Sequence, residues 1–150
     1  MRYIIIGGSA AGISAVEAIR SIDKTSHIEL FSSEGTPFYS RVLLSYYIAG
    51  AITKEELHFR PLEFFAENKV KAHLGQRVAR VLPESKSIRM EDGREYPFDR
   101  LLIATGSSPK ILDIPGKDKK GVVVMRNIDH AQEIDISHHH HTLFILPRDI

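Results

Sequence analysis

The feature that most constrains the fold is a run of small residues directly behind a short apolar segment near the N-terminus. Residues 3–6 are Tyr-Ile-Ile-Ile, and residues 7–12 are Gly-Gly-Ser-Ala-Ala-Gly. A continuous apolar run that stops at glycine is typical of a buried parallel strand. An amphipathic helix is predicted next, with an apolar face made of Ala11, Ala15, Ala18, Ile19 and Ile22. Residues 28–31 predict a second strand, so the first 32 residues have the plan of a βαβ unit.

This loop lies where a phosphate-binding turn lies in a dinucleotide-binding unit. Gly7 permits the tight turn, the small Ser9 lets a pyrophosphate approach the backbone, and Gly12 lets the helix pack closely on the strand. The start of the helix also offers N–H groups and the positive end of its dipole to an anion. Because the strict pattern has Gly where this chain has Ser9, two interpretations stay open: a nucleotide-binding loop, and a plain strand-to-helix turn.

An acidic residue is expected about 20 residues after such a loop, where it would bind a ribose. Ser32 stands near that position, and Glu34 follows two residues later. Glu34 is therefore either a ribose ligand or a solvated carboxylate in a turn.

Two further buried strands and a small antiparallel meander are predicted in the middle of the chain. The buried strands are residues 70–74 and 100–104. The meander spans about residues 77–97, with strands at 77–82, 87–90 and 94–97 and a hairpin turn at Asp92-Gly93.

The segments around these strands give weaker patterns. Residues 37–48 fit neither a clean helix nor a strand, and Thr53 and Glu56 have the spacing of a capping box. A short helix is predicted from Pro61 to Glu67, with Asn68 as its C-terminal cap. Further on, a last strand is predicted at residues 122–125 and the start of a helix at residues 128–134.

Composition excludes several classes of function. With 20 Lys+Arg against 19 Asp+Glu, the formal net charge is +1, so neither nucleic acid nor a membrane surface is expected as a partner. The sequence has 0 Cys, which excludes disulfides, thiolate zinc sites, iron–sulfur clusters and redox-active cysteine pairs. No apolar run approaches the roughly 18 residues of a membrane span, and the expected location is the cytoplasm.

Four segments together resemble the FAD-dependent pyridine nucleotide-disulfide oxidoreductase superfamily. They are residues 4–12, residues 37–50 beginning Pro-Phe-Tyr-Ser-Arg, the meander, and residues 99–109 with their Ala-Thr-Gly. They follow the family's order over about residues 1–136, and the Ala-Thr-Gly that closes a strand is the most specific of them. The resemblance implies an α/β fold, namely a Rossmann-like FAD-binding domain with a parallel sheet plus a small antiparallel meander, as an incomplete glutathione-reductase-like fold. It also assigns the first loop to FAD rather than NAD.

The missing cysteines favour one branch of that family. The chain is similar to the rubredoxin, ferredoxin and nitrite reductases, in which a Tyr-x-Arg-x-x-Leu-Ser segment, here residues 39–45, lines the flavin. Tyr46 and Ser108 stand where many oxygenase-coupled ferredoxin reductases have Lys and Arg, which favours a relative of the rubredoxin or nitrite reductases. The implied activity is hydride transfer from NAD(P)H to FAD, then electron transfer to an acceptor such as rubredoxin, ferredoxin or a nitrite reductase centre.

The resemblance also implies roles for individual residues. The pyrophosphate is expected on the backbone of Gly7, Gly8, Ser9, Ala10, Ala11 and Gly12. The remaining cofactor contacts are expected from Glu34 at the ribose, Arg41 near the flavin or its phosphates, Val78 at the adenine, and Ala104, Thr105 and Gly106 along the cofactor. Arg41 is alternatively a surface cation, and Tyr39 and Tyr46 either stack on the flavin or pack in the ordinary way. No catalytic acid or base and no metal ligand is assigned.

The chain holds one glycine loop, whereas hydride transfer between two dinucleotides needs two binding sites. We therefore expect residues 1–125 to be the N-terminal part of an FAD-binding domain and residues 126–150 to begin a connection to an NAD(P)H domain that is absent here. On this view the chain alone does not turn over and retains FAD poorly. The alternative is a non-catalytic, stand-alone module that binds adenine dinucleotides, or a truncated inactive product.

The tail at residues 137–150 is atypical for the family because it contains His138, His139, His140 and His141. A contiguous histidine run is a weak, mobile chelator rather than a built metal site. A complete purification tag does not fit either, since residues continue to Ile150. We favour a truncated or frame-shifted sequence over unexplained family variation.

Overall fold

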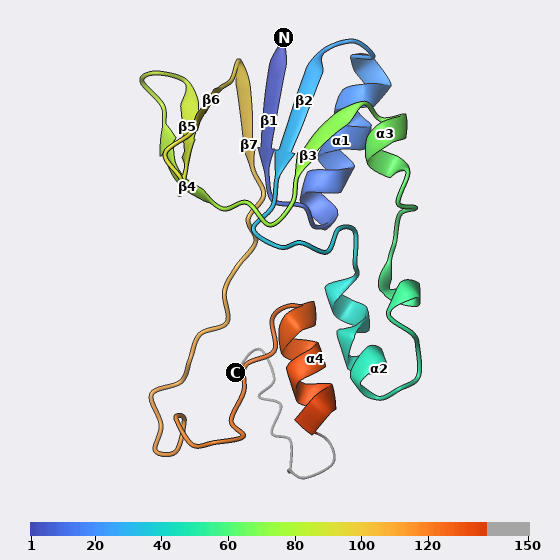
Figure 1. Cartoon of the computed structure of the whole chain (residues 1–150), viewed down its shortest axis with the longest axis vertical. Helices are drawn as coiled ribbons and strands as arrows, with labels where there is room; N and C mark the ends of the chain where they lie inside the picture. The colour runs from blue at the N-terminus through green and yellow to red at the C-terminus, as the bar shows by residue number, and fades with distance from the viewer. Residues whose placement is uncertain (138–150) are drawn as a thin grey trace. The chain divides into compact units, whose positions relative to one another are not determined.

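The apolar segment before the glycine loop forms a central strand of a parallel sheet (Figure 1). β1 (Arg2–Ile6) pairs in parallel with β2 (His27–Phe31) on one side and β7 (Arg100–Ile103) on the other. β3 (Val70–His73) pairs with β2, which gives the order β3-β2-β1-β7. The strands predicted from four separate apolar runs therefore lie side by side in one sheet.

This computed structural model describes residues 1–137, and their contacts divide the chain into two compact units. The first unit consists of Met1–Ser40 and His58–Gly106, and it contains the parallel sheet. The second consists of Arg41–Leu57 and Ser107–Ile150, as far as it is described.

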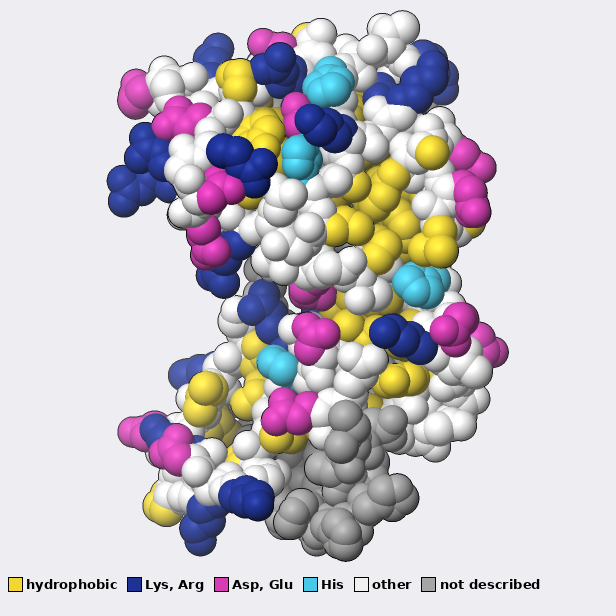
Figure 2. Space-filling model, in the orientation of Figure 1, with side chains coloured by type: hydrophobic (Ala, Val, Ile, Leu, Met, Phe, Trp, Pro, Cys, Tyr) yellow, Lys and Arg dark blue, Asp and Glu magenta, His cyan; other side chains and the backbone are white. Residues whose placement is uncertain are grey.

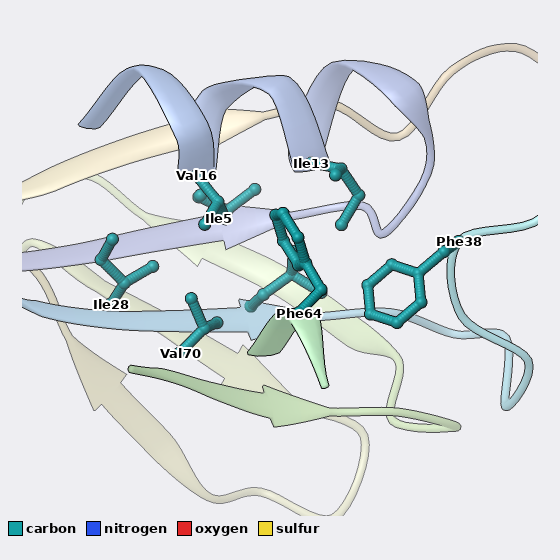
Figure 3. Packing of buried hydrophobic residues seen from close by; sticks show 8 residues of the cluster. Ile5, Ile13, Val16, Ile28, Phe38, Phe64 and Val70 are labelled. Atoms are coloured by element: carbon teal, nitrogen blue, oxygen red, sulfur yellow. The ribbon is translucent and has the colours of Figure 1, made fainter. Parts of the chain in front are cut away.

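α1 (Ala10–Ile22) covers one face of the parallel sheet. Figure 3 shows Ile13 and Val16 of the helix directed toward the sheet, where they belong to one cluster with Ile5, Phe38 and Phe64. These five side chains are buried, and Ile28, Leu30 and Val70 from β2 and β3 complete the cluster. The first core of the unit is thus entirely apolar.

The predicted apolar face of this helix is only partly correct, because Ala15 and Ile19 pack against this cluster whereas Ala11 is exposed. Ala18 is exposed and Ile22 is 85% exposed, whereas the buried residues are Gly12, Ile13, Val16 and Arg20. Burial of Arg20 is possible because its guanidinium donates to the backbone carbonyls of Asn68 (2.6 Å), Asp23 (3.0 Å) and Lys69 (3.2 Å). Ala11 and Ala18 were assigned to the apolar face because alanine occurs at buried and at exposed positions of helices alike.

An antiparallel meander covers the other face of the sheet. It consists of β4 (Val78–Leu82), β5 (Ser87–Met90) and β6 (Glu95–Pro97), in that order. Its Ile88 and Met90 are buried in one cluster with Ile4, Ile6 and Phe31 of the sheet. The predicted Rossmann-like α/β fold with a small meander is confirmed.

The outward side of the meander carries charged side chains of both signs, which Figure 2 shows mixed over this part of the molecule. Arg94 pairs with Asp92 at 2.6 Å and Arg89 pairs with Glu95 at 2.8 Å. At the predicted hairpin turn, the Gly93 N–H donates to the Met90 carbonyl at 3.1 Å, and Gly93 has a φ of +86°. Glycine takes up this backbone conformation without strain.

Short helical segments make up most of the remaining structure. α3 (Phe64–Glu67) is shorter than the predicted 61–67, and Asn68 caps it as predicted, with both its backbone and side-chain nitrogens donating to the Phe64 carbonyl. A capping box forms at Thr53 and Glu56, whose backbone N–H groups donate to each other's side-chain oxygens at 2.7 and 3.4 Å. It caps the start of a 3₁₀ turn over Glu55–Leu57.

In the second unit, the segment that fits no clean pattern forms a 3₁₀ turn over Arg41–Leu43 and then α2 (Leu44–Ile48). α2 packs against α4 (Ile128–Ser137), which confirms the helix predicted from residue 128. Up to residue 134, the buried apolar residues of this pair are Leu44, Ile48, Ile128, Ala131 and Ile134.

The strand predicted at residues 122–125 is wrong. The Val122 N–H donates to the Lys119 carbonyl in a turn, and Val122 and Val124 are both exposed. Among residues 1–137, no strand of either sheet pairs with this segment. A β-branched run forms a strand only where a neighbouring strand accepts its backbone hydrogen bonds.

Two expectations are not tested by the structure. The division into residues 1–125 and 126–150 stays a prediction. The histidine run at residues 138–141 and all of the atypical tail except Ser137 lie outside the described residues. Of the described helices, none combines the length and the apolar character that a membrane crossing requires.

Candidate functional site

The glycine loop is shaped by two backbone contacts that leave no space for a side chain. The Gly7 N–H donates to the Phe31 carbonyl at 2.8 Å, and Gly7 has a φ of +119°. A Cβ atom on Gly7 would lie 2.2 Å from the carbonyl oxygen of Ala104, and one on Gly12 would lie 1.9 Å from the carbonyl oxygen of Gly7. Both distances are far below van der Waals contact, so these two positions require glycine.

The first turn of α1 offers backbone N–H groups beside this loop. Ser9 is the N-cap residue; its carbonyl accepts the N–H of Ile13 at 3.0 Å, and its side chain makes no capping hydrogen bond. The first turn contains no acidic residue. Because the first N–H groups of a helix have no partner within the helix and carry its positive dipole end, this position suits an anion.

Three segments meet at the carboxyl ends of the parallel strands, at the lower edge of the sheet in Figure 1. They are the glycine loop after β1, the segment after β2 and the segment after β7. The Ala104 N–H donates to the Ile6 carbonyl at 2.7 Å, which holds the end of β7 beside the start of the loop. On the other side, a Cβ on Gly8 would lie 3.2 Å from the Cβ of Ser32. In open α/β sheets, ligands bind outside the carboxyl ends of the strands, so this edge is the candidate site.

The predicted residues after β7 and β2 lie at this edge. Thr105 and Gly106 are exposed, and Gly106 has a φ of +69° with open space around its Cα. Glu34 is fixed through its backbone, because its N–H donates to Ser32 Oγ at 3.1 Å and its carbonyl accepts the Gly75 N–H at 3.1 Å. The Glu34 carboxylate also accepts a hydrogen bond from the hydroxyl of Tyr39.

The other two predicted contact residues have structural partners of their own. Val78 begins β4, where it pairs with Met90, and its half-buried side chain packs against the cluster under the meander. Arg41 belongs to the second unit, where its Nη1 donates to the Arg126 carbonyl at 2.6 Å.

The sheet also contains a buried polar pair that was not predicted from the sequence. Glu29 of β2 and His73 of β3 are 6% and 7% exposed, and the His73 Nε2 lies 2.7 Å from the Glu29 Oε2. A charged residue inside the otherwise apolar run at residues 28–31 was the available signal. Within residues 1–137, no group of three or more His, Asp or Glu side chains is arranged to hold a metal ion.

The residues at the edge of the sheet fit an adenine dinucleotide. The helix N-terminus, with its Ser9 hydroxyl unused for capping, can accept a pyrophosphate. The Glu34 carboxylate, on the segment that follows β2, offers acceptors of the kind that ribose hydroxyls need. The roles of the individual residues stay predictions.

Sequence comparisons found a matching family model and several relatives. A family model described as pyridine nucleotide-disulphide oxidoreductase matches residues 1–146. Nitrite reductase [NAD(P)H] of Bacillus subtilis (strain 168) is 36% identical over 128 residues, which are 85% of this chain and 16% of that protein. Rubredoxin-NAD(+) reductase of Pseudomonas putida is 25% identical over 135 residues, 89% of this chain and 35% of that protein.

A solved structure supports the fold. The crystal structure of reduced Bacillus anthracis CoADR-RHD matches with a TM-score of 0.85 at 21% identity, over 93% of this chain and 26% of that chain. The chain thus spans about a third or less of each of these three proteins.

Proposed function

The chain belongs to the pyridine nucleotide-disulphide oxidoreductase family, and on that premise we propose that it is the FAD-binding part of an NAD(P)H-dependent flavoprotein oxidoreductase. The single observation that carries the proposal is the edge of the sheet at which the glycine loop, Glu34 and residues 104–106 come together. The sequence resemblance to the branch without redox cysteines supports it, as does the similarity to a nitrite reductase and a rubredoxin reductase.

In this proposal the chain binds and orients the cofactor. The backbone of residues 7–12 binds the pyrophosphate, Glu34 accepts hydrogen bonds from the adenosine ribose, and the backbone of Val78 meets the adenine. Ala104, Thr105 and Gly106 border the cofactor along the end of β7. The roles of Arg41, Tyr39 and Tyr46 beside the flavin stay predictions.

FAD, when bound, supplies a ring system that accepts a hydride and releases electrons singly or in pairs. The electrons would come from NAD(P)H and pass to an acceptor such as rubredoxin, ferredoxin or a nitrite reductase centre. These partners are inferred from the resemblance and from the names of the two relatives. Both relatives are longer than this chain. The cytoplasmic location also stays a prediction.

Binding of the pyrophosphate can be tested by placing a carboxylate in the first turn of α1. Ala11 is exposed, and an acidic residue at a helix N-terminus stabilises the helix, so Ala11→Asp should fold. The new carboxylate would repel a bound pyrophosphate, so we expect the affinity for FAD and ADP to fall about tenfold or more. Titration calorimetry with each nucleotide measures it.

The matched control is Ala18→Asp, which adds the same charge at another exposed position of α1 and should leave affinity unchanged. A phosphate role for the loop is wrong if Ala11→Asp binds ADP as tightly as the unmodified chain. If neither FAD nor ADP binds the unmodified chain, the proposed function itself fails.

The alternative is a stand-alone module that binds adenine dinucleotides without catalysis, and the presence of one glycine loop in the chain favours it. The two functions are distinguished by adding NADH to this chain loaded with FAD, and to a longer FAD-loaded protein that contains this chain. Bleaching of the yellow flavin colour in the longer protein supports the oxidoreductase. If neither bleaches, the module is the better description.

A further inference from the structure

The turn after β2 contains a hydrogen bond between two side chains five residues apart. The hydroxyl of Tyr39 donates to Oε2 of Glu34. The acceptor residue is fixed through its backbone, because Ser32 Oγ accepts the Glu34 N–H and the Glu34 carbonyl accepts the Gly75 N–H, each at 3.1 Å. The backbone of Glu34 is therefore fixed, and the orientation of its carboxylate depends on the contacts of the side chain.

Tyr39 is itself held in place from two sides. Its neighbour Phe38 is 1% exposed, with its ring centroid 4.4 Å from that of Phe65 and 5.5 Å from that of Phe64. The Phe59 N–H donates to the Phe38 carbonyl at 2.8 Å, and Tyr39 forms an isolated antiparallel bridge with His58. Because Tyr39 is also only 5% exposed, its hydroxyl is a donor with a fixed position.

A fixed donor selects one orientation of a carboxylate. A free Glu side chain loses rotamer entropy when it binds a ligand, and this cost falls when the side chain is oriented beforehand. An ionised carboxylate has about four acceptor positions on its two oxygens, so one hydrogen bond from a phenol leaves capacity for others. The contact with Tyr39 can therefore orient Glu34 without using up its ability to bind.

We propose that Tyr39 is a positioning residue that orients the Glu34 carboxylate toward the ribose hydroxyls of a bound adenosine nucleotide. The proposal rests on the proposed function, since it needs the nucleotide at the edge of the sheet. It differs from both earlier interpretations of Tyr39, stacking on a flavin and ordinary packing, because it assigns the role to the hydroxyl rather than the ring. Removal of the hydroxyl alone should then affect binding of the ribose.

The test is Tyr39→Phe, which keeps the buried ring and removes the donor. Affinity is measured by titration calorimetry for ADP and for 2′,3′-dideoxy-ADP, which has the same adenine and phosphates but lacks both ribose hydroxyls. We expect Tyr39→Phe to weaken ADP about fivefold and to leave the dideoxy nucleotide unchanged. The matched control is Tyr3→Phe, since the Tyr3 hydroxyl also faces a carboxylate, Asp23 at 3.5 Å.

A double-mutant cycle checks that the effect passes through Glu34. Glu34→Ala should also weaken ADP selectively, and adding Tyr39→Phe to it should cause no further loss. Equal losses for both nucleotides would assign Tyr39 a merely structural role and overturn the proposal, and so would unchanged or tighter ADP binding. An unmodified chain that binds neither nucleotide overturns the proposed function and this inference with it. If the unmodified chain binds ADP and the Tyr39→Phe variant binds it equally well, only this inference is overturned.

Discussion

The two faces of the parallel sheet are built from alternate residues of the same strands, yet they bury different chemistry. On the face under α1, Ile5, Ile28 and Leu30 pack with apolar side chains only. On the face under the meander, Ile4, Ile6 and Phe31 are accompanied by the buried Glu29 and His73. An apolar core forms when the side chains fill the available volume. A buried polar pair also needs a strand register that brings its two groups within hydrogen-bonding distance.

The polar pair is surrounded by groups that fix its geometry. The His73 ring stacks on Phe31 with centroids 4.2 Å apart and an interplanar angle of 3°. The Tyr96 ring makes a T-shaped contact with His73, with centroids 5.3 Å apart. Glu29 faces the Nε2 of His27 at 3.3 Å and the Nζ of Lys71 at 3.9 Å. Since Phe31 pairs with His73 and Glu29 with Lys71 in the ladder, the register of β2 and β3 decides whether these groups meet.

The largest effect is expected on the apolar face. Leu30 is 0% exposed, so Leu30→Ala removes packed methyl groups and leaves a cavity between α1 and the sheet. We expect a loss of about 2 to 5 kcal/mol in the free energy of unfolding, measured by guanidinium denaturation. Ile22→Ala, at a position that is 85% exposed, should change it by less than about 0.5 kcal/mol. A similar cost for the two variants would contradict the placement of the core.

An intermediate effect is expected on the polar face. Glu29→Leu leaves the buried imidazole of His73 without its carboxylate, and we expect a loss of about 1 to 3 kcal/mol. The double variant Glu29→Leu/His73→Phe, which keeps a ring on Phe31, should recover most of it, because replacing both partners by apolar groups is often neutral. Denaturant midpoints of the unmodified chain, of Glu29→Leu, of His73→Phe and of the double variant give the comparison. Additive losses in the double variant would mean that the pair contributes as two separate groups.

The smallest effect on the free energy of unfolding is expected at the C-terminal end of α1, where Asp23 is the capping residue. Hydrogen bonds from the side chain and backbone of Ser26, and from the Thr25 N–H, hold the pKa of the Asp23 carboxyl well below its ordinary value. A lowered pKa means that the folded state favours the carboxylate. Asp23 therefore stabilises the fold above the unfolded pKa of about 3.9, and this contribution is lost as the pH falls toward the folded value.

The corresponding measurement is the urea midpoint between about pH 5 and pH 3. The unmodified chain should lose more stability on acidification than Asp23→Asn, which has no carboxyl to protonate. Equal slopes for the two proteins would show that Asp23 is not the group responsible.

Much of the fold could be predicted because the strands are apolar runs that end at turn residues. Asp92-Gly93 gave the meander hairpin, and the glycine loop gave the strand-to-helix unit. The helix face was misassigned in part, because alanine fits both buried and exposed positions, and because burial of Arg20 depends on the carbonyls of Asn68 and Lys69, which are distant in the sequence.

Less of the candidate site could be predicted. Gly7 and Gly12 have the turn and packing roles expected from the sequence, but the Ala104 carbonyl that also restricts Gly7 is distant in the sequence. The contact between Tyr39 and Glu34 depends on the chain reversal at Phe38, which has a φ of +55°, and on pairing with His58. No local pattern announces a positive φ at a phenylalanine, so this contact appears only in three dimensions.

The contacts of Gly7 and Gly12 also limit how the site can change during evolution. Any side chain at position 12 would displace the Gly7 carbonyl, and any side chain at position 7 would displace the end of β7 at Ala104. A mutation at either position therefore has to be matched by simultaneous movement of two other elements, which single substitutions rarely achieve. New ligand preferences are accessible by single steps at the tolerant neighbours Ser9, Ala10 and Ala11, where side chains are at least partly exposed. The two positions that require glycine thus lie on either side of three that can change by single substitutions.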